Sequence, residues 1–178
     1  MDQQPNLFNR STRWGAWVAI AITIVSAFEG FSAKPYVERV GRGHPETWCY
    51  GTTASDHPAP PYGTIFTKLE CQTMLGSDLL KYDTGVKKYV HVIMGPNTEA
   101  AMVDAAYNLG PNVFAHGSMT RYLNAGGNFT EPPRSTAYRH NHSAACEALK
   151  SYNRASGRVL TGLVRRRKAE AVLCHKDD

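Results

Sequence analysis

The sequence lacks the short motifs that mark a metalloprotein or a nucleic-acid-binding protein. It contains no CxxC pair and no HExxH run, and His140 and His142 lie among polar residues, where solvated surface histidines are expected. The basic residues gather mainly near the C-terminus, without an RNA-binding signature or interleaved aromatic residues. No internal repeat is present. We therefore expect no metal ion, no cofactor and no nucleic-acid partner.

Neither charged nor hydrophobic residues are unusual in amount. Charged residues make up 20% of the 178 residues and hydrophobic ones 42%, which suits one globular domain with a real core. The net charge of +5 favours an acidic partner, such as anionic lipid or a bacterial cell-wall polymer.

The segment Trp14–Ala33 lacks any charge except Glu29. Its length suits a membrane-spanning helix, but alanine, glycine, threonine and serine make it only weakly hydrophobic. Glu29 either marks the point where such a helix leaves the lipid or is a functional carboxylate. Because Arg10 and Arg13 precede the segment, residues 1–13 are predicted to stay cytoplasmic while the body is exported.

A removable signal peptide is the alternative interpretation of this segment. The best cleavage site follows Val25-Ser26-Ala27, and cleavage there would leave Glu29 in the mature protein. The apolar run is longer than a typical signal-peptide core, so we expect it to be retained.

The rest of the chain predicts turns and short strands followed by helices. Glycine, proline and β-branched residues indicate strands within 34–53 and a loop over 54–66. Thr67 and Glu70 form a capping box that opens a helix. Further helices are expected over 99–110, after a cap at Asn97 or Thr98, and over 118–126, 144–152 and 163–174, with a loop over 127–143.

The spacing of residues around Glu29 resembles that of the phage-type lysozymes. Eight residues lie between Glu29 and Glu38, and eight more between Glu38 and Thr47. In the family, Asp or Cys stands at the position of Glu38, and only five residues separate it from the following Thr. We therefore place the extra residues of this chain in a longer hairpin tip at 41–44. Four later segments resemble family landmarks in the same order: residues 67–71, 105–110, 118–126 and 162–170.

This resemblance implies an α+β, lysozyme-like fold with a small β-hairpin lobe around residues 36–53 and a mostly helical lobe from about residue 67. It implies an enzyme that hydrolyses the β-1,4 bond between N-acetylmuramic acid and N-acetylglucosamine, with inversion. Glu29 would be the proton donor, Glu38 would orient water or stabilise the transition state, and Thr47 would hold the attacking water.

Three further expectations concern the cleft around Glu29. Asn108 and Tyr36 are candidate substrate-binding residues, and one arginine of the Arg165–Arg167 run would pair with Glu29 or contact the glycan. Asn108 could instead simply end its helix, and Glu38 could form a surface ion pair with Arg39.

The N-terminal segment resembles the signal-anchor-release segment of one subset of phage endolysins. The chain would then comprise a tail (1–13), an anchor helix (14–33) and a catalytic domain (29–178). The resemblance implies host export machinery, the host inner membrane and peptidoglycan as successive partners, and a monomer that ends soluble in the periplasm. No cysteine lies within 14–33, which excludes activation by an anchor thiol.

The four cysteines are an even set in a chain whose body is exported, which permits disulfides. Sequence alone does not choose among the three possible connectivities; by their placement along the chain we expect Cys49–Cys71 and Cys146–Cys174. Alternatives to a hydrolase remain open: an inactive peptidoglycan-binding module, a permanently anchored structural protein, and a lytic transglycosylase.

Overall fold

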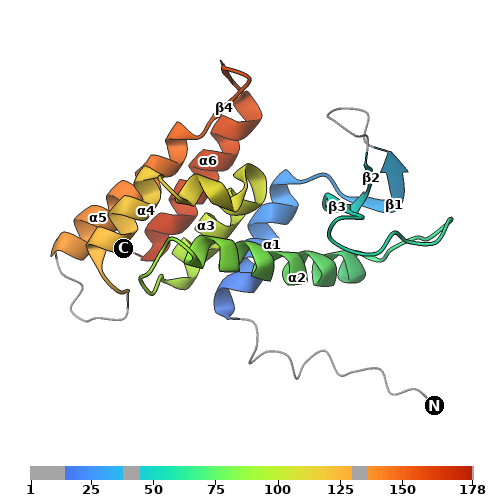
Figure 1. Cartoon of the computed structure of the whole chain (residues 1–178), viewed down its shortest axis with the longest axis horizontal. Coiled ribbons are helices and arrows are strands. Elements are labelled where there is room, and N and C mark those ends of the chain that lie inside the picture. Colours follow the sequence, from blue (N-terminus) through green and yellow to red (C-terminus); the bar gives the residue numbers. More distant parts are fainter. Residues whose placement is uncertain (1–14, 38–44, 130–135, 178) are drawn as a thin grey trace, which may run out of the picture.

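The computed structural model describes residues 15–37, 45–129 and 136–177, in which a small sheet lies at one end of the molecule and the later helices gather at the other (Figure 1). This arrangement confirms the expected α+β fold, with a small sheet lobe and a mostly helical lobe. The elements in chain order are α1 (Ala16–Phe28), β1 (Ser32–Val37), β2 (Glu46–Cys49), β3 (Thr52–Thr53), α2 (Lys68–Lys87), α3 (Pro96–Leu109), the 3-10 helix η2 (Pro111–Phe114), α4 (Ser118–Gly126), α5 (Thr136–Ala148), η3 (Leu149–Ser151), β4 (Arg154–Ala155), β5 (Arg158–Val159), α6 (Thr161–Cys174) and η4 (His175–Asp177).

Helix α1 lies within the predicted segment 14–33, ends just before Glu29 and belongs to the core. One stripe of its side chains is buried: Trp17, Val18, Ala21 and Val25. This stripe packs against α2 and α3. The helix ends at Phe28, and the chain enters β1 four residues later. Within the described ranges, no helix combines the length and the hydrophobicity needed to cross a membrane.

Strands β1, β2 and β3 form an antiparallel sheet in that order, where turns and short strands were predicted. Tyr36 of β1 lies opposite Thr47 of β2, and Thr47 lies opposite Thr53 of β3. Trp48 and Cys49 are buried, so β2 is the strand that joins the small lobe to the core.

Two helices follow the start signals of the sequence closely. Helix α2 begins with the predicted capping box: the Thr67 hydroxyl accepts from the Glu70 backbone N–H, and the Glu70 carboxylate accepts from the Thr67 N–H. Helix α3 begins at Pro96, where a proline at the first position is tolerated because its missing N–H would have had no helical partner. The buried alanines of α3 allow close packing against α1, α2 and α6.

The polar stretch predicted as a loop over 127–143 contains the beginning of α5, so that part of the prediction is wrong. The helix forms because Tyr138, His142 and Ala145 bury one face, which its polar composition conceals. His142 is therefore not a surface histidine; its ring lies 2.7 Å from the Thr98 hydroxyl in the core. The short hairpin β4–β5 was also not predicted.

The cysteines form the bridges Cys49–Cys71 and Cys146–Cys174, as expected from their placement. The first joins β2 to α2, and the second joins the ends of α5 and α6. Each bridge therefore connects two separate elements of the fold.

Removing the first bridge should loosen the small lobe. Replacing Cys49 and Cys71 together by serine should lower the free energy of unfolding by about 3 kcal/mol, because the closed loop spans 22 positions. Urea denaturation of the oxidised proteins measures this difference. Equal stability of the two proteins would contradict a structural role for the bridge.

Candidate active site

Glu29 is placed by the end of α1. It is the C-cap of the helix, with extended backbone and its N–H donating to the Val25 carbonyl at 2.9 Å. Its side chain is 26% exposed, and its Oε1 lies 2.5 Å from Nη1 of Arg166 on α6. The carboxylate is therefore accessible to a ligand on one side and held by a guanidinium on the other.

Arg166 is buried and connects α1, α3 and α6. Its Nε and Nη2 donate to the two carboxylate oxygens of Asp104 on α3, at 3.2 and 2.6 Å, in the bidentate geometry that suits guanidinium. The Phe28 ring lies 5.7 Å from Arg166 Cζ and adds a cation–π contact. Burial alone would lower the pKa of Arg166, but its hydrogen bonds to Asp104 and Glu29 outweigh burial and raise that pKa.

Arg167 and Glu170, the neighbours of Arg166 on α6, form a second group of buried charged residues. Arg167 Nη2 donates to Asn108 Oδ1 at 3.0 Å and lies 2.5 Å from Glu170 Oε1, although the latter contact lacks hydrogen-bond geometry. Burial, together with repulsion from the neighbouring Asp104 carboxylate, raises the pKa of Glu170 well above its ordinary value. A protonated Glu170 leaves Asp104 without a second negative charge beside it in this buried cluster.

Glu29 opens onto a cleft of about 280 Å³, lined by Glu29, Gly51, Asp56, Asp78, Tyr82, Tyr107 and Asn108. The rings of Tyr82 and Tyr107 meet edge to face, with centroids 5.0 Å apart. The Tyr107 hydroxyl donates to the Tyr50 carbonyl at 2.7 Å, which fixes this ring against the turn after β2. Burial first, and then the nearby carboxylates, raise the pKa of Tyr107. The cleft thus combines aromatic rings with several polar groups.

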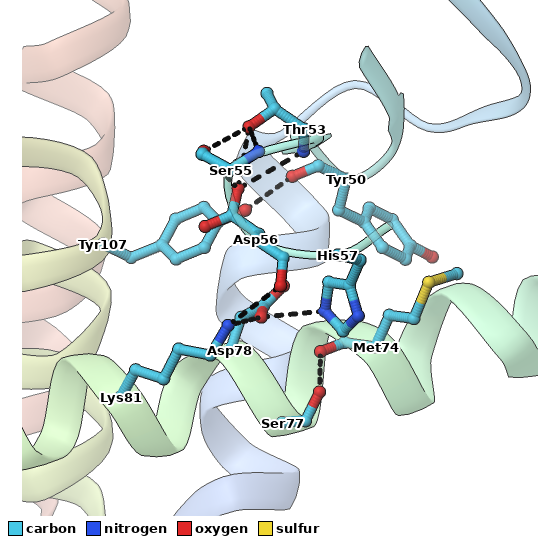
Figure 2. Close-up of polar contacts among 10 residues, drawn as sticks. All are labelled: Tyr50, Thr53, Ser55, Asp56, His57, Met74, Ser77, Asp78, Lys81 and Tyr107. Carbon is cyan, nitrogen blue, oxygen red and sulfur yellow. Dashed lines mark hydrogen bonds and ion pairs between the residues drawn. The ribbon is translucent and has the colours of Figure 1, made fainter. Parts of the chain in front are cut away.

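One wall of the cleft is tied to α2 by charged groups (Figure 2). Asp78 Oδ1 lies 2.9 Å from His57 Nε2 and 3.0 Å from Lys81 Nζ. Lys81 Nζ also donates to the Asp56 carbonyl at 3.3 Å. These contacts hold the loop after β3 against the helix.

The structure brings together only some of the predicted site residues. Glu29 and Asn108 line the same cleft, and Arg166 is the arginine that pairs with Glu29. Tyr36 and Thr47 pair with each other in the sheet and do not line this cleft. Thr47 is buried, and its hydroxyl donates to the Pro45 carbonyl at 3.3 Å. The prediction for Glu38 lies outside the described residues.

Sequence reasoning missed Asp56, Asp78, Asp104 and Tyr107 as parts of the site. Asp78 and Asp104 carried a usable signal, because an acidic residue within the apolar pattern of a helix needs a buried partner. Asp56 lies in a proline-rich loop and carried none. Among the described residues, the possible metal ligands that gather in one place are His142, Cys146 and Cys174, and both of these cysteines are in a disulfide.

Arg166 should be far more important for stability than its neighbour. Replacing Arg166 by methionine leaves the buried Asp104 without its partner and should lower the free energy of unfolding by about 3–5 kcal/mol. Arg165 is exposed on the same helix, and Arg165→Met should change the free energy of unfolding by no more than about 0.5 kcal/mol. Urea denaturation compares the two variants; similar losses would contradict the central place given to Arg166.

Glu170 should make stability depend on pH. Its pKa is raised in the folded chain, so the folded state binds more protons than the unfolded state above the ordinary value of 4.5, and stability falls as the pH rises. Glu170→Gln has no such proton to lose. Urea denaturation at roughly pH 5, 7 and 9 should therefore show the variant gaining stability relative to the parent as the pH rises. If the difference in stability between the variant and the parent stays constant over this pH range, Glu170 is already ionised in the folded protein and the account of its raised pKa is wrong.

Comparison with known proteins agrees with this geometry. The family model for phage lysozyme matches residues 26–170. The SAR-endolysin of bacteriophage PS119 is 28% identical over 166 residues, covering 90% of this chain and 87% of that protein. The endolysin of Bacillus phage B103 is 31% identical over 153 residues, covering 85% of this chain and 51% of that protein.

Among solved structures, the active form of P1 phage endolysin Lyz superposes with a TM-score of 0.69 at 20% identity, covering 96% of this chain and 89% of that one. This likeness supports the fold. The span matched by the family model contains Glu29, Asp104 and Arg166, together with the whole cleft. The chain belongs to the phage lysozyme family.

Proposed function

We propose that this phage endolysin is a muramidase that hydrolyses the β-1,4 bond between N-acetylmuramic acid and N-acetylglucosamine in peptidoglycan. The observation that carries the proposal is the position of Glu29, a partly exposed carboxylate at a helix end that opens onto a cleft of polar and aromatic residues. Such a cleft suits a saccharide, whose rings have both apolar faces and many hydroxyl groups.

Glu29 acts as the general acid in this proposal. It donates a proton to the leaving glycosidic oxygen and becomes a carboxylate as the bond breaks. The Arg166 guanidinium, 2.5 Å from Glu29 Oε1, stabilises the negative charge that develops there. Asp104 holds Arg166 in place through two hydrogen bonds, so the stabilising charge needs no rearrangement during the reaction.

Glu38 and Thr47 are proposed to act on the other face of the sugar. Glu38 would orient a water molecule or stabilise the oxocarbenium-like transition state, and the Thr47 hydroxyl would help to hold that water. Water attack opposite the leaving group would invert the anomeric carbon. The support for these roles is the resemblance of the Glu29, Glu38 and Thr47 spacing to the family pattern.

Replacing Glu29 by glutamine tests the reaction. The variant should fold normally and lose about 10²-fold or more of its activity on purified peptidoglycan, because the amide cannot donate the required proton. Glu147→Gln is the matched control, since Glu147 is an exposed glutamate on α5, away from the cleft. Both variants are compared by release of soluble fragments.

Mass analysis of the fragment ends separates the alternatives. A muramidase leaves hydrated N-acetylmuramic acid ends, whereas a lytic transglycosylase leaves anhydro ends. Anhydro ends would show that the enzyme is a lytic transglycosylase and not a hydrolase. A parent protein that binds peptidoglycan without releasing fragments would instead be a binding module.

We further propose that the enzyme is exported in an inactive, membrane-tethered form and is activated by release. The support is the composition of α1, which carries no charge and presents small side chains such as Ala19 and Thr23 to solvent. A helix of this kind tolerates both lipid and water. While it lies in the bilayer, Glu29 is held at the membrane surface and cannot meet Arg166.

Leucine at the two exposed positions tests the tether without disturbing the core. Ala19→Leu together with Thr23→Leu should favour the bilayer by tenths of a kcal/mol or more per position. The variant should be exported, remain in the membrane fraction and delay lysis. Ala19→Ser with Thr23→Ser is the control and should behave like the parent. Lysis on schedule by a fully membrane-bound leucine variant would show that tethering does not inhibit.

A further inference from the structure

Asp56 lines the same cleft as Glu29, and its two carboxylate oxygens have different surroundings. Oδ2 accepts from the Thr53 N–H at 3.3 Å, from the Thr53 hydroxyl at 3.0 Å and from the Ser55 hydroxyl at 3.4 Å (Figure 2). Within the described part of the chain, Oδ1 makes no hydrogen bond. One oxygen therefore closes the turn, and the other remains able to accept a hydrogen bond.

The loop that carries Asp56 is fixed at both ends. Strand β3 precedes it, and His57 is bound to the buried Asp78 of α2. Lys81 donates to the Asp56 backbone carbonyl as well as to Asp78. The carboxylate of Asp56 is thus positioned before any ligand arrives, which lowers the entropy lost on binding.

Several other polar atoms of the cleft already have partners within the protein. Asp78 Oδ1 is shared by His57 and Lys81, and the Tyr107 hydroxyl is donated to the Tyr50 carbonyl. Glu29 has one oxygen on Arg166, and its chemistry is proton donation. An N-acetylated sugar presents several hydroxyl groups and an acetamido N–H, each of which needs an acceptor when water is displaced.

We infer that Asp56 is a substrate-binding residue, whose Oδ1 accepts a hydrogen bond from a hydroxyl or the acetamido N–H of the N-acetylated sugar beside Glu29. This inference rests on the proposed function and adds a carboxylate that binds rather than reacts. The rings of Tyr82 and Tyr107 lie in the same cleft and supply apolar surface for the sugar. A hydrogen bond to a charged acceptor is among the stronger ones that a sugar can gain.

Binding is measured without turnover in the full chain carrying Glu29→Gln, with tri-N-acetylchitotriose as the probe and isothermal titration calorimetry as the readout. Adding Asp56→Asn replaces the charged carboxylate with a neutral amide, whose oxygen is a weaker acceptor and whose NH2 group accepts nothing. The dissociation constant for the trisaccharide should therefore rise at least about tenfold. Thr53→Val is the matched control, because it removes the 3.0 Å bond to Oδ2 from the other side. This control should change the dissociation constant by less than about threefold.

Two outcomes overturn the inference. Unchanged affinity in the Asp56→Asn protein shows that Oδ1 does not contact the sugar. Equal losses in the Asp56→Asn and Thr53→Val proteins show that Asp56 serves only the turn. Thermal unfolding of each variant accompanies the titrations.

A second variant covers the case in which Asp56→Asn is unstable. Asp56→Ser keeps one side-chain oxygen for the turn and leaves nothing to accept from the sugar, so it should fold and bind weakly. Normal binding by this variant also overturns the inference. Failure of the proposed function looks different: Glu29→Gln would then retain hydrolysis of peptidoglycan, whatever the variants at Asp56 do.

Discussion

The ion pairs that run from Glu29 through Arg166 to Asp104 are the constraint on which the rest of the structure depends. Arg166 is buried, and a buried guanidinium is tolerated only when its hydrogen bonds and charge are satisfied. Asp104 satisfies one edge of it with two bonds, and Glu29 meets Nη1 at the cleft surface. Helices α1, α3 and α6 must therefore meet at one point, because each contributes one residue to this series of ion pairs.

Small side chains make that meeting possible. Helix α3 buries Ala100, Ala101, Ala105 and Ala106 completely, so neighbouring helices approach its backbone closely. Helix α1 packs on this surface through Val18, Ala21 and Val25, and the last turn of that helix fixes where Glu29 emerges. A larger residue on either helix would move the carboxylate away from Arg166, since a packed core has little free volume.

Local signals predicted the parts of this protein that depend on neighbouring residues. The Thr67–Glu70 capping box located the start of α2, because the two residues that form it lie three positions apart. The site depends on contacts of another kind: 137 positions separate Glu29 from Arg166, and 62 separate Arg166 from Asp104. The run Arg165–Arg167 shows that a cation is available but not which arginine faces inward, because only packing decides that.

The buried cluster also bears on how the proposed release would be driven. The two bonds from Arg166 to Asp104 involve α6 and α3 and not α1, so Asp104 can neutralise that guanidinium without Glu29. It does need α1 to cover the apolar surface that Val18, Ala21 and Val25 bury. Burial of that apolar surface is the larger favourable term, and the single ion pair of Glu29 with Arg166, which opens onto the cleft, adds less. Hydrophobic packing would therefore draw the helix into the body, and the ion pair would then orient the carboxylate for its reaction.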